Sequence, residues 1–382
     1  LTMKHLFTLL ALTIGFSMNG QLGPLIENGI TGQRLLISNA SNHGGIGFNA
    51  IDLSYSISSS TTFGATGSYS IATGYQTIAS GTNSIAMGEE TEASGNRTLA
   101  SGYQTIASGN RSTAIGNTTT SSGYSSTAMG NGTIASGNSS TATGYQTIAS
   151  GTNSIAMGNS TTASGATSTA MGLNTTSSGY SSTAMGRLTT ASGNSSTAMG
   201  QSTTASGFNS TASGFNSIAS DYGSLVIGQY NLSGATVTNS ATEFNTANTA
   251  FVIGNGTGSS NQSDAFSVLF SGETVIGNDL EVKGNVLVSS DARLKANIIS
   301  LGSTLAKLLL IDGKRYTMKK DGKQNIGVLA QDIQKVFPEL VSTDNRDMLA
   351  VNYQGLVPVL INALKEQDAK MKEQEKRLER LE

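Results

Sequence analysis

The sequence predicts a mainly β N-terminal part, built as a solenoid of 14-residue coils, and an α+β C-terminal domain that ends in a parallel coiled coil. Three observations support this fold class. A glycine occupies every seventh position from Gly67 to Gly214. Residues 290–382 hold 29 of the 46 charged side chains, whereas residues 65–230 hold seven. Residues 355–382 carry an apolar heptad pattern.

Residues 1–20 have the pattern of a secretory signal peptide. A short positive start precedes an apolar run from Leu6 to Phe16, and small and polar residues follow, so cleavage is expected near Gly20. The run is too short to span a bilayer as a helix, and a buried N-terminal helix or strand is the alternative interpretation. We expect residues 21–64 to form a β region, and we expect no transmembrane segment in the mature chain.

A period of seven also occurs in coiled coils, but the repeated residues do not suit a helix. A glycine every two helical turns costs about 1 kcal/mol each relative to alanine, and Ser, Thr and Ile favour extended or turn structure. The residue before each glycine alternates in places, as at Met185, Ser192 and Met199, so the true repeat has 14 residues. We therefore expect short strands closed by glycine turns with positive φ. About twelve coils over residues 65–230 would make a fibre of roughly 55–60 Å, at about 4.8 Å per stacked strand.

Small residues form one row of the repeat and larger apolar residues form another. Alanine precedes the glycines by two residues, except where Ser121 and Ser177 replace it. Because side chains along a strand alternate between faces, the Ser and Ala of residues 84–87 share one face and the Ile and Met share the other. We expect the Ser/Ala row to fill a narrow interior and the Ile/Met row to face neighbouring chains.

Residues 65–230 resemble the head repeats of YadA-type trimeric autotransporter adhesins, through motifs such as Asn-Ser-Ile-Ala-Met-Gly at 153–158 and Ser-Thr-Ala-Met-Gly at 196–200. The resemblance implies a trimeric left-handed parallel β-roll. The residue after each glycine varies and includes Tyr103 and Tyr124, which predicts an outer row. Such a row suits a surface glycan or matrix ligand, or is simply tolerated in solvent.

The composition argues against several kinds of site. The chain contains no cysteine, which excludes disulfides and thiolate metal sites. Of its two histidines, His5 lies in the expected signal peptide, and His43 has no supporting motif for a Ser-His-Asp triad. A net charge of −2 gives no reason to expect nucleic acid binding. The Gly-rich residues 254–260 lack the lysine and helix of a phosphate loop, and we expect no cofactor and no metal.

Residues 231–289 keep the sequence pattern of β-strands and are expected to form a connector. At Ser290 the sequence changes from this pattern to one rich in charged residues. Four motifs follow in order: SDARLK at 290–295, IGVLAQ at 326–331, FPELV at 337–341 and VNYQGLVPVLI at 351–361. Through these motifs the region resembles the endosialidase-type intramolecular chaperone domain, a serine peptidase family of phage tail spikes and fibres. The resemblance implies an auto-processing domain over residues 290–354.

The resemblance implies self-cleavage between Ser289 and Ser290, with Ser290 as the nucleophile and Lys295 as the general base. Asp291 and Arg293 also match the motif, without an assigned role. A serine hydroxyl is a weak nucleophile until a neighbour takes its proton. A free lysine, with a pKa of about 10.4, is charged at neutral pH, so it acts as a base only where burial lowers its pKa.

The spacing of the two residues has its own consequence. Residues five apart lie about 140° apart around a helix and on opposite faces of a strand. Ser290 and Lys295 therefore meet only if a bend joins them or if a neighbouring subunit contributes. The alternative interpretation of the motif is that Ser290 and Asp291 cap a helix that begins near Ala292.

The C-terminal residues 355–382 predict a parallel coiled coil. Apolar residues recur at alternating spacings of three and four, with two glutamines inside the seam and charged residues on the other faces. The alternative is a single amphipathic helix that packs on its own domain. The expected core residues are Val357, Leu360, Leu364, Gln367, Met371, Gln374, Leu378 and Leu381.

Together these patterns predict a secreted or cell-surface homotrimeric fibre or adhesin, whose C-terminal domain aligns three chains and then cleaves itself. A low-complexity repeat pairs equally well in several registers, so a clamp at one end would supply the register. The alternatives are a trimeric adhesin that does not cleave and a phage tail fibre. The expected signal peptide argues against the tail fibre, because phage fibres assemble in the cytoplasm.

Overall fold

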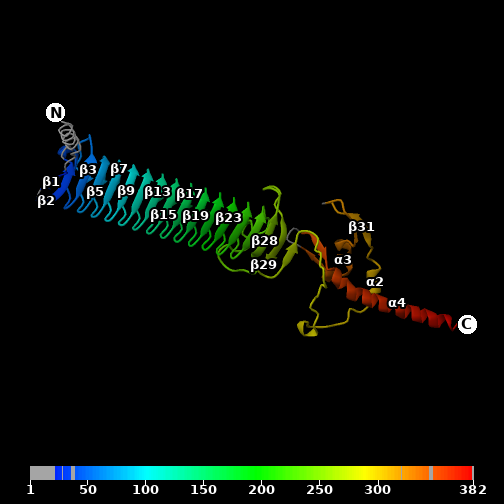
Figure 1. Ribbon diagram of the computed structural model, residues 1–382. Coiled ribbons are helices and arrows are strands. Elements are labelled where there is room, and N and C mark those ends of the chain that lie inside the picture. The colour runs from blue at the N-terminus through cyan, green and yellow to red at the C-terminus, as the bar shows by residue number, and fades with distance from the viewer. Residues whose placement is uncertain (1–21, 28, 36–38, 320, 344–346, 381–382) are drawn as a thin grey trace, which may run out of the picture. The chain divides into compact units, whose positions relative to one another are not determined.

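The structure is a computed structural model, and it describes residues 22–27, 29–35, 39–319, 321–343 and 347–380 (Figure 1). The chain divides into two compact units, and the boundary in the sequence falls between Glu281 and Val282. Each unit is described by itself. The expected signal peptide, residues 1–20, lies outside the described residues.

The first unit is a β-solenoid, in which each 14-residue coil contributes one long and one short strand to two parallel sheets (Figure 1). Each residue pairs with the residue 14 positions later, as Ala72 does with Ala86 and Ala79 with Ala93. The prediction of stacked 14-residue coils is confirmed. The long strands are β5 (Ile71–Tyr75), β7 (Ile85–Glu89), β9 (Leu99–Tyr103), β11 (Thr113–Asn117), β13 (Thr127–Asn131), β15 (Thr141–Tyr145), β17 (Ile155–Asn159), β19 (Thr169–Leu173), β21 (Thr183–Arg187), β23 (Thr197–Gln201), β25 (Thr211–Phe215) and β27 (Leu225–Gln229).

The short strands each contain two residues and form the second parallel sheet. They are β4 (Gly64–Ala65), β6 (Ile78–Ala79), β8 (Glu92–Ala93), β10 (Ile106–Ala107), β12 (Thr120–Ser121), β14 (Ile134–Ala135), β16 (Ile148–Ala149), β18 (Thr162–Ala163), β20 (Thr176–Ser177), β22 (Thr190–Ala191), β24 (Thr204–Ala205) and β26 (Ile218–Ala219).

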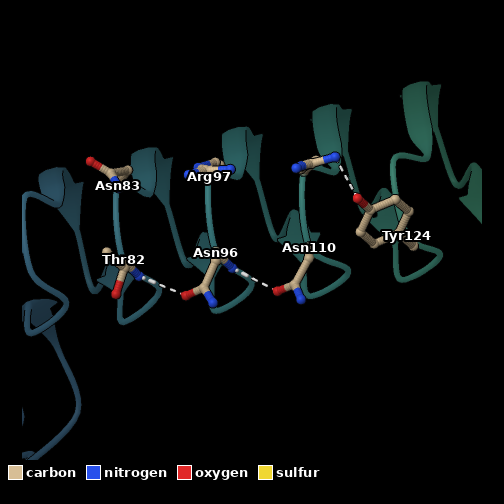
Figure 2. A pocket seen from close by; sticks show the side chains of 7 residues that line it. Thr82, Asn83, Asn96, Arg97, Asn110 and Tyr124 are labelled. Atoms are coloured by element: carbon tan, nitrogen blue, oxygen red, sulfur yellow. Dashed lines mark hydrogen bonds between the residues drawn. The ribbon is translucent and has the colours of Figure 1, made fainter.

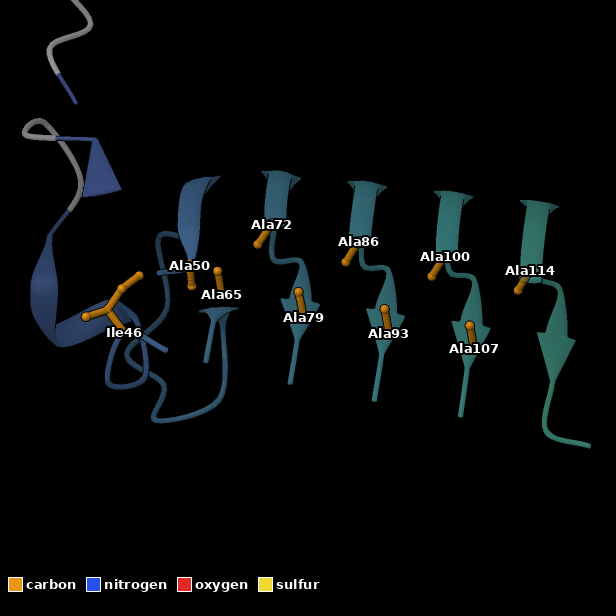
Figure 3. Close-up of a cluster of buried hydrophobic side chains, with 10 residues drawn as sticks. All are labelled: Ile46, Ala50, Ala65, Ala72, Ala79, Ala86, Ala93, Ala100, Ala107 and Ala114. Carbon is orange, nitrogen blue, oxygen red and sulfur yellow. The ribbon is translucent and has the colours of Figure 1, made fainter. Parts of the chain in front are cut away.

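The interior of the solenoid is filled by alanine and by small hydroxyl side chains. The alanines of both sheets point inward and stack from coil to coil (Figure 3). Ser84 and Ala86 are fully buried, whereas Met87, next to them on the strand, is 37% exposed. The predicted division into an inward Ser/Ala row and an outward Ile/Met row is therefore confirmed.

The glycines have a different role from the one expected. Gly88 has φ +123 but lies inside β7, and Gly81 does not adopt a positive φ; the corners are made by Asn83 (φ 59) and Glu90 (φ 54). The expected positive φ is confirmed at Gly88, but the corner residues Asn83 and Glu90 are not glycines, which corrects that part of the expectation. A Cβ on Gly81 would overlap the carbonyl oxygen of Gly95 in the next coil, and the glycines of the long strands meet the next coil in the same way. Glycine is required because successive coils approach too closely for any side chain.

The two serines that interrupt the alanine row are accommodated by hydrogen bonds inside the solenoid. Ser121 is fully buried, and its Oγ lies 2.7 Å from Oγ of Ser126. Ser126 donates its own proton to the carbonyl oxygen of Gly123 at 2.7 Å, so Ser121 is the donor to Ser126. Ser177 and Ser182 repeat this arrangement at 2.6 Å. Each exceptional hydroxyl therefore has an acceptor.

Additional strands extend the long-strand sheet at both ends of the solenoid. At the N-terminal end, β1 (Leu22–Glu27) and β2 (Ile30–Leu35) form an antiparallel hairpin, and β2 pairs with β3 (Ile51–Tyr55) after the short helix η1 (Ala40–Asn42). At the other end, β28 (Thr249–Asn255), β29 (Asp264–Leu269) and β30 (Thr274–Ile276) continue the sheet.

The loop that closes the solenoid is anchored by Asp221, which stands where the repeat would place a glycine. Its buried carboxylate accepts hydrogen bonds from the backbone amides of Thr238 and Thr249, both at 2.7 Å. The repeat therefore ends at Asp221, which binds the backbone of the following connector.

The second unit is α+β, as predicted, with a small core of Ile333, Phe337 and Val359. Two short antiparallel hairpins accompany the helices. Its elements are η2 (Ala292–Leu294), α2 (Leu305–Leu308), β31 (Lys314–Thr317), β32 (Gln324–Gly327), α3 (Ala330–Val336), η3 (Pro338–Leu340), β33 (Val341–Thr343), β34 (Leu349–Val351), η4 (Tyr353–Gly355) and α4 (Leu356–Leu378).

Candidate functional site

Ser290 and Lys295 lie together at the start of the second unit. Nζ of Lys295 donates a hydrogen bond to Oγ of Ser290 at 2.7 Å, and both side chains are exposed. Between them lies the single turn of η2, and Lys295 follows this turn in an extended conformation. This turn supplies the bend that the five-residue spacing requires, so the contact forms within one chain.

Asp291 and Arg293 stabilise the turn that brings the pair together. The carboxylate of Asp291 accepts a hydrogen bond from the amide of Arg293 at 2.8 Å and forms an ion pair with its guanidinium at 2.7 Å. These hydrogen bonds from Arg293 hold the pKa of Asp291 below its ordinary value of 3.8. Asp291 thus caps the helix, and the hydroxyl of Ser290 remains available to Lys295.

A second contact, which the sequence did not indicate, ties the segment after this turn to α4. The carboxylate of Glu366 accepts hydrogen bonds from the Ser303 hydroxyl at 2.6 Å and from the amides of Thr304 and Leu305, where α2 begins. The buried hydroxyl of Thr304 donates to the carbonyl oxygen of Val359 at 2.9 Å. We call this group the α4 clamp. No local motif predicts it, because its partners are about 60 residues apart.

The heptad seam of α4 is not covered by the chain's own domain. Val359 and Ala363 are buried against the domain, whereas Leu364 is 72% and Leu378 is 65% exposed. A helix that packed its seam on its own domain would bury these residues, so the seam remains open to a partner. The other described seam residues, Val357, Leu360, Gln367, Met371 and Gln374, are exposed as well, and Leu381 lies outside the described residues.

His43 contacts a serine and an aspartate, but not in the order of a catalytic triad. Its Nδ1 lies 3.3 Å from both Oγ of Ser54 and the carboxylate of Asp52, and Ser54 donates directly to Asp52 at 2.5 Å. A triad needs the serine and the carboxylate on opposite ring nitrogens. Burial alone would raise the pKa of Asp52, but hydrogen bonds from His43 and Ser54 hold it below 3.8. With Arg34, which donates to Asp52 at 2.9 Å, the group is a buried polar cluster at the end of the solenoid.

In the described part of the chain, no group of three His, Asp or Glu side chains is arranged to hold a metal ion. None of the helices in that part is long and apolar enough to span a bilayer.

Comparisons with known proteins agree with this division of the chain. The model of the YadA head domain repeat matches residues 65–90, 93–119, 121–147, 149–175, 177–203 and 205–231, and the model of the chaperone of endosialidase matches residues 290–342. The long tail fiber protein Gp37 of Escherichia phage AR1 is 33% identical over an alignment of 92 residues, which covers 22% of this chain and 8% of that protein. The chain therefore spans less than a tenth of that relative's length. Residues 65–231 are thus similar to YadA head domain repeats, and residues 290–342 are similar to the chaperone of endosialidase.

Proposed function

We propose that this chain is one protomer of a homotrimeric surface fibre, whose C-terminal domain aligns three chains and then cleaves the bond between Ser289 and Ser290. The observation that carries the proposal is the hydrogen bond of 2.7 Å from Lys295 Nζ to Ser290 Oγ, directly after that bond. The match to the chaperone of endosialidase begins at the same residue, Ser290. The proposed nucleophile is therefore the first residue of the matching segment, and the proposed base contacts it.

In the proposed reaction, Oγ of Ser290 attacks the carbonyl carbon of Ser289 while a neutral Lys295 takes the hydroxyl proton. The bond from that carbon to the Ser290 nitrogen breaks, and the lysine returns the proton to the released amine. An ester now joins Ser289 to the Ser290 oxygen. Water hydrolyses this ester, which leaves a carboxylate on Ser289 and restores the hydroxyl of Ser290.

Assembly into a trimer is supported by apolar side chains that a single chain leaves in water. On the solenoid, Ile and Met residues of successive long strands lie on the outer face, and on α4 the heptad seam is exposed. Repeated apolar rows of this kind are typical of surfaces that pack against another copy. The exposed members of the solenoid row include Met87, Ile115, Met129, Ile155 and Met157.

Assembly also bears on the proposed chemistry. In the single chain Lys295 is exposed and acts as the hydrogen-bond donor to Ser290, whereas a general base must accept a proton. Removing water from a lysine favours its neutral form. We therefore propose that docking of three chains covers Lys295 and starts the cleavage.

A denaturing gel and the intact mass of the purified chain test this function. The wild type is expected to give two fragments, the second beginning at Ser290, and Ser290→Ala is expected to stay whole. Ser289→Ala is the matched control, because it changes the adjacent serine but keeps the nucleophile, and it should still be cut. A wild-type chain that stays intact as a trimer would instead support an adhesin that does not cleave.

A phage tail fibre is the second candidate, and the similarity to Gp37 of Escherichia phage AR1 favours it. Export separates the two candidates, because a surface fibre must leave the cytoplasm. Residues 1–30 fused to a phosphatase that is active only outside the cytoplasm should give activity if the expected signal peptide functions. An inactive fusion that remains in the cytoplasm would favour the tail fibre.

A further inference from the structure

A groove of about 370 Å³ runs along one corner of the solenoid and crosses four successive coils (Figure 2). Asn83, Arg97 and Arg111 occupy equivalent corner positions, 14 residues apart, and all three have a positive φ near 60°. The groove also contains Tyr124, on the next coil. All four side chains are exposed in the chain.

The groove concentrates the positive charge of the repeats. Residues 65–230 contain three cations, and two of them, Arg97 and Arg111, lie here on adjacent coils. Within the described residues neither arginine forms an ion pair with a carboxylate. Glu90 stands at the alternate corner, seven residues from Arg97, and accepts a hydrogen bond from Gln104. The two guanidiniums therefore face the groove without a counter-charge.

The floor of the groove also presents hydrogen-bond donors. The Oδ1 of Asn96 accepts the amide of Thr82 at 3.1 Å, and the Oδ1 of Asn110 accepts the amide of Asn96 at 3.0 Å (Figure 2). These bonds fix the orientation of both side-chain amides, because only the oxygen accepts a backbone N–H. Their Nδ2 groups remain as donors. Arginine carries donors alone, so the polar groups that converge here select for a ligand rich in acceptor oxygens.

Tyr124 adds an aromatic surface at one end of the groove. Its hydroxyl accepts a hydrogen bond from Arg111, and the Arg111 Cζ lies 5.3 Å from the ring centroid. These contacts hold the guanidinium in place, and Tyr124 as a whole remains 44% exposed. An exposed aromatic ring offers an apolar face beside polar contacts, which matches the mixed C–H and hydroxyl surface of a sugar.

We propose that this groove binds an anionic saccharide. A carboxylate or sulfate would lie between Arg97 and Arg111, because the planar guanidinium groups donate paired hydrogen bonds to such anions. The two arginines lie on adjacent coils, which are about 4.8 Å apart. Sugar hydroxyls would accept from the amides of Asn96 and Asn110, and the sugar ring would pack on Tyr124. The inference rests on the proposed function, since a surface fibre meets such glycans, and it specifies which part of the repeats binds them.

Binding is tested on the full chain by fluorescence anisotropy, at about 0.15 M salt, where long-range charge effects are screened. The probes are labelled hexasaccharides of hyaluronan, which carries carboxylates, and of heparin, which also carries sulfates. Neutral chitohexaose and a hexaglutamate peptide are the comparison ligands. At least one of the two acidic saccharides should bind more tightly than both comparison ligands. Which one binds identifies the anion.

Three variants locate the site. The double variant R97S/R111S should weaken saccharide binding by about tenfold or more, because it removes both charge-assisted contacts. Arg187→Ser is the matched control, because it removes the remaining exposed arginine of the repeats, and it should stay within about twofold of the wild type. Tyr124→Leu should weaken binding by about threefold or more through loss of the aromatic face.

Three results would overturn the inference: no binding of either acidic saccharide, an equal loss in Arg187→Ser, or equally tight binding of hexaglutamate. Light scattering and a denaturing gel on the same samples report assembly and cleavage. A trimer that processes itself but binds neither saccharide contradicts the groove alone, whereas a chain that stays monomeric contradicts the proposed function.

Discussion

Glu366, in the middle of α4, accepts a hydrogen bond at 2.6 Å from the hydroxyl of Ser303, which lies 63 residues earlier in the chain. Ser303 lies eight residues after Lys295, and Glu366 lies between the seam residues Leu364 and Gln367. The α4 clamp therefore connects the candidate cleavage segment to the helix that carries the expected trimer contacts.

Replacing Glu366 by Gln should loosen the start of α2. The glutamine side chain keeps the shape but lacks the charge that strengthens bonds to the Ser303 hydroxyl and the Thr304 amide. Hydrogen exchange of a peptide covering residues 302–310, measured in the full chain, should become faster. Glu373→Gln, an exposed position on the same helix, should leave this exchange rate unchanged.

The same clamp should be sensitive to acid. The hydrogen bonds from Ser303 and from the Thr304 amide lower the pKa of Glu366 from its ordinary value of 4.5. A carboxyl group with a lowered folded pKa stabilises the fold above its unfolded pKa and loses this contribution as the pH falls through the folded value. Protection of the α2 amides, expressed relative to the intrinsic exchange rate at each pH, should therefore fall below about pH 4.5 in the wild type. An acid response of the same size in Glu366→Gln would assign it to another group.

Cleavage should depend on assembly. Replacing both Leu364 and Met371 by Asp places like charges in the exposed seam, so trimer content and cleavage should fall together. Lys295→Ala should abolish cleavage and leave trimers intact. Lys365→Asp, next to the seam, is the control for added negative charge. Rapid cleavage in a double variant that light scattering shows to be monomeric would rule out assembly-coupled catalysis.

Removing residues 369–382 should leave the fold of the second unit intact but impair alignment of the repeats. The cut keeps Val359, Ala363 and Glu366, which pack on or bind to the domain, and it removes the seam from Met371 onward. Light scattering should then show mixed or aggregated species, because coils 14 residues apart pair equally well. A uniform trimer from this truncation would show that the terminal seam does not set the register.

The paired serines of the solenoid should differ in their effect on stability. Ser126→Ala leaves the buried hydroxyl of Ser121 without its acceptor, which should cost about 1–3 kcal/mol. Ser121→Ala restores the repeat alanine and should cost less, and the double variant should recover much of the loss. Urea unfolding of the wild type, the two single variants and the double variant measures the coupling energy between Ser121 and Ser126. Strictly additive effects would contradict the assigned donor and acceptor.

The solenoid was predictable because each position repeats. Ser84, Ala86 and Met87 have counterparts along the whole roll, so strand alternation alone predicts which rows are buried. The corner residues were assigned wrongly, because the sequence shows that glycine permits a positive φ but not how closely the next coil approaches Gly88.

The C-terminal site was only partly predictable. Spacing required a bend between Ser290 and Lys295, but it could not show that Asp291 caps the turn and leaves Ser290 free. The contact between Glu366 and Ser303 depends on tertiary packing, for which no local pattern exists.

The constant 14-residue register also affects how such a chain changes over generations. Every coil meets its neighbours through the same backbone pairing, so recombination that gains or loses one coding unit leaves all remaining interfaces unchanged. The length of the fibre would then vary in increments of about 4.8 Å. The strands that extend the sheet at the two ends of the solenoid would stay unchanged. The fibre's length is thus a heritable trait that is separable from its folding.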